Sequence, residues 1–286
     1  HNGEVMGESE KMGLMEKAAF ICPPGEGCAV KVAPVEGSGY PGGEDFIVNV
    51  EEASPTLESS VSPGGKLEEM ELEGDRIYVV GNRGLRILEA ATSLGALSWT
   101  HGPGYSMMTG LARQGNQLFV SRLGLFGLVV FDTRDAQNPV ELGRTFTLGI
   151  AWDVAVYDKT AYVAHGILGV GSYDISDPSQ PSWTGQMWPG GRIVSVSVSR
   201  KERLLAVGRA NGKVYIYSLA GEGPELVAEV EAEGRLGEVK LKQGRLWVLG
   251  KHGIRAEIFE PEQEEGQWEK AGEVSTRGRR YFWAKT

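Results

Sequence analysis

The side chains of this 286-residue chain that are best suited to chemistry are a set of aspartates, two histidines and two cysteines. Asp132 and Asp135 recur 42 residues later as Asp174 and Asp177, and a proline follows each second aspartate by four residues. Spaced carboxylates could bind calcium. Aspartates before a proline are also typical of turns, in which the carboxylate accepts a hydrogen bond from a backbone amide two residues on. The repetition with proline favours turns over a metal site.

Two of the four histidines, His165 and His252, each begin a His-Gly-Ile sequence. A pair of histidines on one face of a fold could bind a metal ion or act in general acid–base catalysis. The equivalent positions elsewhere in the chain hold Arg83, Phe126 and Asn211, which do not complete a ligand set. We therefore interpret both histidines as turn residues and predict no catalytic residue, metal site or cofactor.

The only cysteines, Cys22 and Cys28, lie in the short loop CPPGEGC. We expect them to form a disulfide; a metal-binding pair, with too few ligands for a zinc site, and free thiols are the alternatives. A disulfide favours an oxidising compartment. Because the sequence begins with His1, a signal peptide or longer N-terminal segment could have been removed. The expected location is secreted, periplasmic or at the cell surface.

The elements that must position these residues are short β-strands, shown most clearly by residues 152–185. Alternating and β-branched or aromatic residues predict strands at 153–156, 161–164, 170–175 and 183–188. Gly, Pro and Asp separate them. Four such strands cannot bury their apolar faces alone, so this unit predicts neighbours of the same kind.

The unit recurs along the chain. A glycine precedes the third strand at positions 84, 127, 169, 212 and 253, and an apolar pair in the second strand keeps step with it. A repeat of about 42 residues with four strands is typical of a β-propeller blade. The five units span residues 66–104, 105–148, 149–190, 191–234 and 235–275.

A sixth unit would begin near residue 280, where the sequence RYFWA at 280–284 predicts an innermost strand. This strand would expose aromatic residues unless outer strands covered it. Strands predicted at 29–35 and 46–50 could supply them. We therefore expect an all-β fold: a single propeller of six four-stranded antiparallel blades, or seven if the native chain continues. Residues 1–65 would be an acidic arm that completes the last blade, and residues 66–286 would be the propeller repeats.

Charge is distributed unevenly over the chain. The net charge is −9, but residues 1–75 alone hold 16 acidic and 4 basic side chains. With no basic face and a pI near 5.2, nucleic acid is not an expected partner. No apolar run approaches the roughly 18 residues of a transmembrane helix.

Two segments resemble LVIVD repeats, which form propellers in surface or secreted proteins of bacteria and archaea. They are YVAHGILGVGSYDISDP in the third unit and LFVSRLGLFGLVVFDTRDAQNP in the second. The other units keep the glycine and the strands but lose the Asp-x-x-Asp turn. The resemblance covers residues 67–275 and implies a propeller. Because the family has no common catalytic motif, it implies an interaction module and no reaction.

The turns of units two and three hold large apolar residues where polar turn residues are usual. Such clusters often mark interaction sites, although another segment of the chain could cover them. We expect a non-enzymatic extracellular or cell-surface scaffold, alone or within a larger assembly, that binds a protein partner or a second copy of itself. The alternative is a propeller hydrolase or lyase with its site at the channel mouth, although the common hydrolase and nucleotide-binding motifs are absent. The expected partner-binding residues are Leu123, Leu125, Phe126, Ile167 and Leu168.

Overall fold

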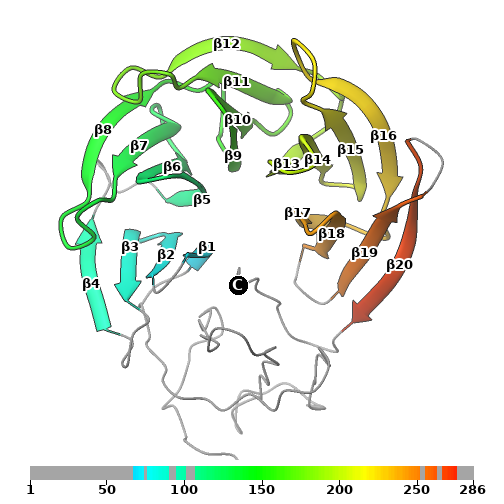
Figure 1. The fold of residues 1–286 in the computed structure, drawn as a ribbon, viewed down its shortest axis with the longest axis horizontal. Helices are drawn as coiled ribbons and strands as arrows, with labels where there is room; N and C mark the ends of the chain where they lie inside the picture. Colours follow the sequence, from blue (N-terminus) through cyan, green and yellow to red (C-terminus); the bar gives the residue numbers. More distant parts are fainter. Residues whose placement is uncertain are drawn as a thin grey trace, which may run out of the picture.

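The structure is a computed structural model that describes residues 67–73, 76–89, 95–100, 107–251, 255–262 and 266–275. These residues form twenty strands in five antiparallel sheets of four, each a simple meander (Figure 1). The innermost strands of the sheets surround a common axis and the fourth strands lie at the rim. The predicted all-β propeller is confirmed, and we number its sheets as blades one to five.

The strands of each blade follow one another from the axis outwards. Blade one holds β1 (Leu67–Glu73), β2 (Arg76–Gly81), β3 (Gly84–Glu89) and β4 (Gly95–Thr100). Blade two holds β5 (Met108–Gln114), β6 (Gln117–Arg122), β7 (Leu128–Asp132) and β8 (Val140–Thr145). Blade three holds β9 (Asp153–Tyr157), β10 (Thr160–Ala164), β11 (Val170–Asp174) and β12 (Ser182–Met187). Blade four holds β13 (Ile193–Ser199), β14 (Leu204–Arg209), β15 (Lys213–Ser218) and β16 (Glu225–Glu231). Blade five holds β17 (Leu236–Lys242), β18 (Arg245–Gly250), β19 (Arg255–Pro261) and β20 (Trp268–Ser275).

The described residues thus form five blades, one fewer than the six that we predicted. The segments expected to build the sixth, residues 280–284, 29–35 and 46–50, lie outside the described residues. The division into an acidic arm and propeller repeats also depends on residues outside this part of the chain. The sixth blade therefore stays a prediction.

The hydrophobic core consists of layers between successive blades rather than one central core. On β6, Phe119 packs into the layer shared with blade three, while its neighbours Leu118 and Val120 pack into the layer shared with blade one. The middle strands are buried on both faces in this way, because successive side chains of a strand point to opposite faces. This arrangement explains their nearly continuous apolar sequences.

Polar side chains on the innermost strands join each blade to the next. Glu69 of β1 accepts a hydrogen bond from the backbone amide of Leu111 in β5 at 2.8 Å, and Asp153 of β9 accepts that of Val196 in β13 at 2.9 Å. The hydroxyl of Ser195 in β13 likewise accepts a hydrogen bond at 3.1 Å from the backbone amide of Val239 in β17. These innermost strands have an unpaired edge, so the side chains satisfy amides that no strand partner can reach.

Candidate interaction face

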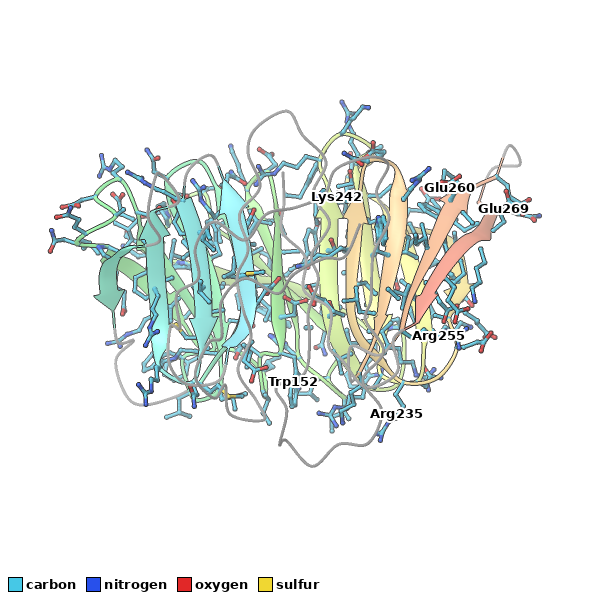
Figure 2. All side chains as sticks on the ribbon, turned by 90° about the horizontal axis from the view of Figure 1, so that it is seen from below. Trp152, Arg235, Lys242, Arg255, Glu260 and Glu269 are labelled. Atoms are coloured by element: carbon cyan, nitrogen blue, oxygen red, sulfur yellow. The ribbon has the colours of Figure 1, made fainter. Side chains whose placement is uncertain are left out.

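The meander topology assigns every turn to one of two faces of the disc. Successive strands run in opposite directions, so the hairpins between second and third strands lie on the same face as the connections between blades. We call this the connection face. Figure 2 shows Trp152 and Arg235, which precede innermost strands, on one side of the disc. Lys242, Glu260 and Glu269, next to the other hairpins, lie on the opposite side.

Large apolar side chains are exposed on the connection face at blades two and three. Leu125, at the tip of the β6–β7 hairpin, is 77% exposed, and Ile167, at the equivalent tip of blade three, is 71% exposed. The connections that follow β8 and β12 add four more. We call these six residues the apolar patch: Leu125, Phe146, Leu148, Ile150, Ile167 and Trp188.

The hairpin tips and the blade connections pack against each other. The rings of Phe126 and Phe146 have centroids 4.3 Å apart. The side chain of Leu168 lies against Gly149, where a Cβ atom would come within 2.9 Å of it. Leu123, Phe126 and Leu168 are therefore only partly exposed and support the more exposed residues around them. The structure brings the five predicted residues to one face, although only Leu125 and Ile167 are strongly exposed.

The tip of blade two is held by its own backbone. The amide of Arg122 donates to the carbonyl of Gly127 at 2.9 Å, and the amide of Leu123 donates to the carbonyl of Met107 at 2.8 Å. The guanidinium of Arg122 also donates to the carbonyl of Phe126 at 2.7 Å. Leu125 thus projects from a fixed loop, which lowers the entropy lost when a partner covers it.

The tip of blade three separates a buried histidine from an exposed isoleucine. The ring of His165 packs against Gly171, and its Nε2 lies 3.3 Å from the hydroxyl of Tyr173. Burial lowers the pKa of His165 to about 4, so the ring is neutral at neutral pH. The predicted turn thus places His165 inside the fold, whereas His252 lies outside the described residues.

A line of arginines continues the connection face from blade three to blade five. Arg192 stacks over the ring of Trp152 at 4.5 Å, and the guanidinium of Arg209 lies against Gly191. Arg235 follows in the next connection, just before β17. Within the described part of the chain, none of these three arginines has a carboxylate within ion-pair distance. We call Arg192, Arg209 and Arg235 the arginine strip.

The opposite face carries the repeated aspartates. Asp135 and Asp177 each accept a hydrogen bond at 2.9 Å from the amide two residues on, and Asp132 and Asp174 do so at 2.9 and 2.8 Å. Side-chain hydrogen bonds from residues of the same turns, followed by these backbone bonds, lower the pKa of each carboxyl group. The turn interpretation is confirmed. No group of three or more metal-binding side chains occurs among the described residues.

A second set of charged groups lies along the axis. The ammonium of Lys240 on β17 contacts the carboxylate of Glu69 across the ring and lies 3.2 Å from that of Glu238. Burial raises the pKa of Glu69 to about 8 even though Lys240 opposes the shift. Burial likewise raises the pKa of Asp153. Although burial disfavours the ammonium, the surrounding carboxylates hold the pKa of Lys240 well above its ordinary value.

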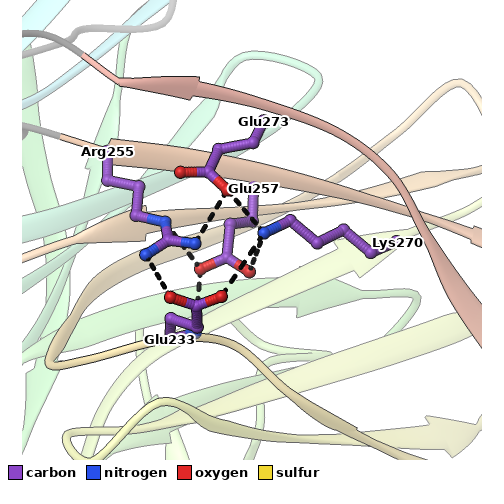
Figure 3. A network of polar contacts seen from close by, with 5 residues as sticks. All are labelled: Glu233, Arg255, Glu257, Lys270 and Glu273. Atoms are coloured by element: carbon purple, nitrogen blue, oxygen red, sulfur yellow. Dashed lines mark hydrogen bonds and ion pairs between the residues drawn. The ribbon is translucent and has the colours of Figure 1, made fainter.

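A third set joins the outer strands of blade five to the preceding connection (Figure 3). Arg255 lies 2.6 Å from Glu233 and 2.7 Å from Glu273, and Lys270 lies 3.2 Å from Glu257. The amide of Glu233 donates to Glu257 at 2.8 Å. Each carboxylate has a cationic partner, so this network stabilises blade five and leaves no group unpaired for chemistry.

The comparisons with known proteins agree with this geometry. A family model described as LVIVD repeat matches residues 148–187, which include all four strands of blade three and its exposed tip. This chain is a β-propeller, and its third blade matches an LVIVD repeat. No curated protein matches its sequence.

Two solved structures show the same fold at low identity. The computationally designed protein Ika8 is 12% identical, with a TM-score of 0.53. The match covers 72% of this chain and only 62% of Ika8. The β-propeller domain of Cps50 (Swd1) from Myceliophteria thermophila is 13% identical, with 74% and 72% of the two chains covered and a TM-score of 0.59. Identities this low show the fold alone.

Sequence reasoning missed several residues of the LVIVD-repeat propeller's connection face. Phe146, Leu148 and Ile150 lie in the segment FTLGIAW, whose apolar content between predicted strands was the available signal. Trp188 was predicted as the last residue of a strand, but β12 ends at Met187. Cys22 and Cys28 lie outside the described residues, so their disulfide stays a prediction. The described residues include no helix long and apolar enough to cross a membrane.

Proposed function

We propose that this LVIVD-repeat propeller is a non-enzymatic interaction module that binds a partner protein through its apolar patch. The observation that carries the proposal is the grouping of six exposed apolar side chains in neighbouring loops of one face. Burying one such side chain is worth roughly 1.5–3 kcal/mol. Contiguous patches of this kind are uncommon on monomeric proteins and often mark binding surfaces.

The opposite face offers an internal contrast. Its turns in blades two and three contain the aspartates at 132–135 and 174–177, whose carboxylates are already hydrogen-bonded within the turns. The outer strands expose single apolar residues such as Val140, which is 59% exposed. Scattered residues of this kind need no partner, whereas the apolar patch is concentrated on blades two and three.

A binding function agrees better with the axial charges than the alternative of a hydrolase or lyase at the channel mouth. Glu69 and Asp153 each accept an inter-blade amide, so their carboxylates have a structural role. Lys240 is in turn paired with Glu69 and Glu238. A catalytic acid or base needs an oxygen that is free to reach substrate.

We place this module outside the cell or at its surface, as a subunit of a larger assembly. The LVIVD repeat and the expected Cys22–Cys28 disulfide support this location. Intact-mass measurement of alkylated protein, with and without reductant, tests the disulfide. Two alkylated thiols in protein purified under non-reducing conditions from its native source would exclude the bond.

Site-directed photo-crosslinking tests the binding function. A benzophenone amino acid is placed at Ile167 in the apolar patch or, as a control, at exposed Gln137 on the opposite face. In cells of the native source, we expect a crosslinked partner protein from position 167 and none from position 137. Equal crosslinking from both positions, crosslinks only between copies of this chain, or none at all would overturn the proposal.

A further inference from the structure

We infer that the partner contributes an acidic segment whose large apolar side chains cover the apolar patch and whose carboxylates bind the arginine strip. This inference rests on the proposed function and adds the chemistry of the partner. The patch occupies blades two and three, and the strip extends from the edge of blade three to blade five. The two sets of residues form one continuous surface on the connection face.

The continuity of this surface begins at the tip of blade three. The indole of Trp152 lies against Gly166, the residue before Ile167 of the apolar patch. Arg192 stacks on that same indole at 4.5 Å. The residue after Arg192 also donates its backbone amide to the carbonyl of Gly166 at 2.8 Å. The first arginine of the strip is therefore fixed beside the patch.

The remaining arginines follow through a chain of backbone contacts. The carbonyl of Arg192 accepts a hydrogen bond at 2.8 Å from the amide of Ala210, the residue after Arg209. The carbonyl of Ala210 in turn accepts one at 3.3 Å from the amide of Leu236, the residue after Arg235. These bonds join the connections of blades three, four and five into one row. A single extended or helical segment could span it.

The charge of the connection face indicates that its partner carries carboxylates. The described loops of the connection face hold one acidic residue, Glu233, which is already bound to Arg255 and Lys270. A partner that covered unpaired guanidinium groups without supplying carboxylates would incur their desolvation cost without compensation. Arginine also binds carboxylates through paired, planar hydrogen bonds, which lysine cannot do.

A protein segment fits this face better than a nucleic acid. Nucleic-acid-binding surfaces carry many phosphate contacts from basic residues, whereas this face combines three unpaired arginines with six exposed apolar side chains. Apolar and acidic residues in one segment satisfy both parts of the face.

Selection from a phage library that displays random peptides tests this inference on the immobilised full chain. We expect enriched peptides that combine aromatic or aliphatic residues with an excess of Asp and Glu. The variant Arg192→Glu/Arg235→Glu should retain the apolar preference and lose the acidic one. For a selected peptide, it should also raise the Kd by roughly tenfold or more. The variant Leu125→Asp/Ile167→Asp should enrich no peptide, whereas the control Val140→Asp should behave as the wild type.

Each other outcome overturns the inference. Patch-dependent peptides without acidic excess would refute the acidic partner and leave the proposed function standing. Absence of any patch-dependent enrichment would refute both. Tighter binding of a labelled single-stranded DNA than of the selected peptide would assign the strip to nucleic acid. Displacement of the selected peptide by a synthetic peptide of residues 1–20 would assign the face to this chain's own acidic segment.

Discussion

Asp153 occupies space that is free only because residue 110 of the neighbouring blade is glycine. A Cβ atom at Gly110 would lie 2.6 Å from the Asp153 carboxylate and 2.8 Å from its Cα atom. The carboxylate accepts hydrogen bonds from the hydroxyl of Ser195 at 2.7 Å and from the amide of Val196 at 2.9 Å. One acidic residue therefore determines how blades two, three and four meet at the axis.

Replacing Asp153 with alanine should lower the free energy of unfolding by roughly 2–4 kcal/mol, because it leaves a buried amide and a hydroxyl without an acceptor. Asp153→Asn keeps one acceptor oxygen and should cost less. Urea denaturation followed by tryptophan fluorescence measures both. Equal stability of the alanine variant and the wild type would show that the inter-blade bond contributes nothing.

At the scale of strands and loops, the ion network of blade five joins neighbouring segments at the rim, as Asp153 joins blades at the axis. Glu257, whose side chain is 3% exposed, faces Arg255 and Lys270 and accepts the amide of Glu233. The hydrogen bond from Arg255 lowers the pKa of Glu233, and the one from Lys270 lowers that of Glu273. The network thus attaches the β16–β17 connection to β19 and β20.

Glu257→Ala should destabilise the protein by about 1–3 kcal/mol, since it removes the shared acceptor of this network. The exposed Glu269 on β20 provides a matched control, and Glu269→Ala should change stability by less than about 0.5 kcal/mol. Denaturation curves of the two variants decide the matter. A control as damaging as Glu257→Ala would mean that charge on β20, not the network, is responsible.

The positions of individual strands could be predicted from the sequence, whereas the exposure of loop residues could not. The strand predicted at 153–156 is β9, Asp153–Tyr157, and that predicted at 170–175 is β11, Val170–Asp174, because glycines and alternation act locally. The exposure of Phe146 and Trp188 could not be predicted, since it depends on which face a connection reaches. The contact between Glu69 and Lys240 joins residues 171 positions apart and requires the closed ring geometry.

At the scale of the whole molecule, the axial charges couple the fold to pH. The pKa of Glu69 is raised from 4.5 to about 8 by burial, so the folded state binds a proton that the unfolded chain releases. The stabilisation is fully present below the ordinary pKa and is lost as the pH rises through about 8. The difference between the connection face and the opposite face also arises only in the assembled disc, because the disc places the two sets of turns on opposite sides.

The free energy of unfolding should therefore fall between about pH 4.5 and about pH 8, and Glu69→Gln should flatten this decline because it removes the titrating group. Glu225→Gln, on the exposed strand β16, should leave the decline unchanged. Denaturant titrations at a series of pH values measure the slope. A decline that is equally steep in the Glu69 variant would place the responsible group elsewhere.

The central claim, that the connection face binds a protein, is tested most directly by the size of the tagged full chain recovered from its native source. Wild type and Val140→Asp should elute in a complex well above the 30.9 kDa of the monomer. Ile167→Asp should elute as a monomer with an unchanged melting temperature, because Ile167 lies outside the strands. A complex that survives Ile167→Asp, or that Val140→Asp disrupts equally, would contradict the account.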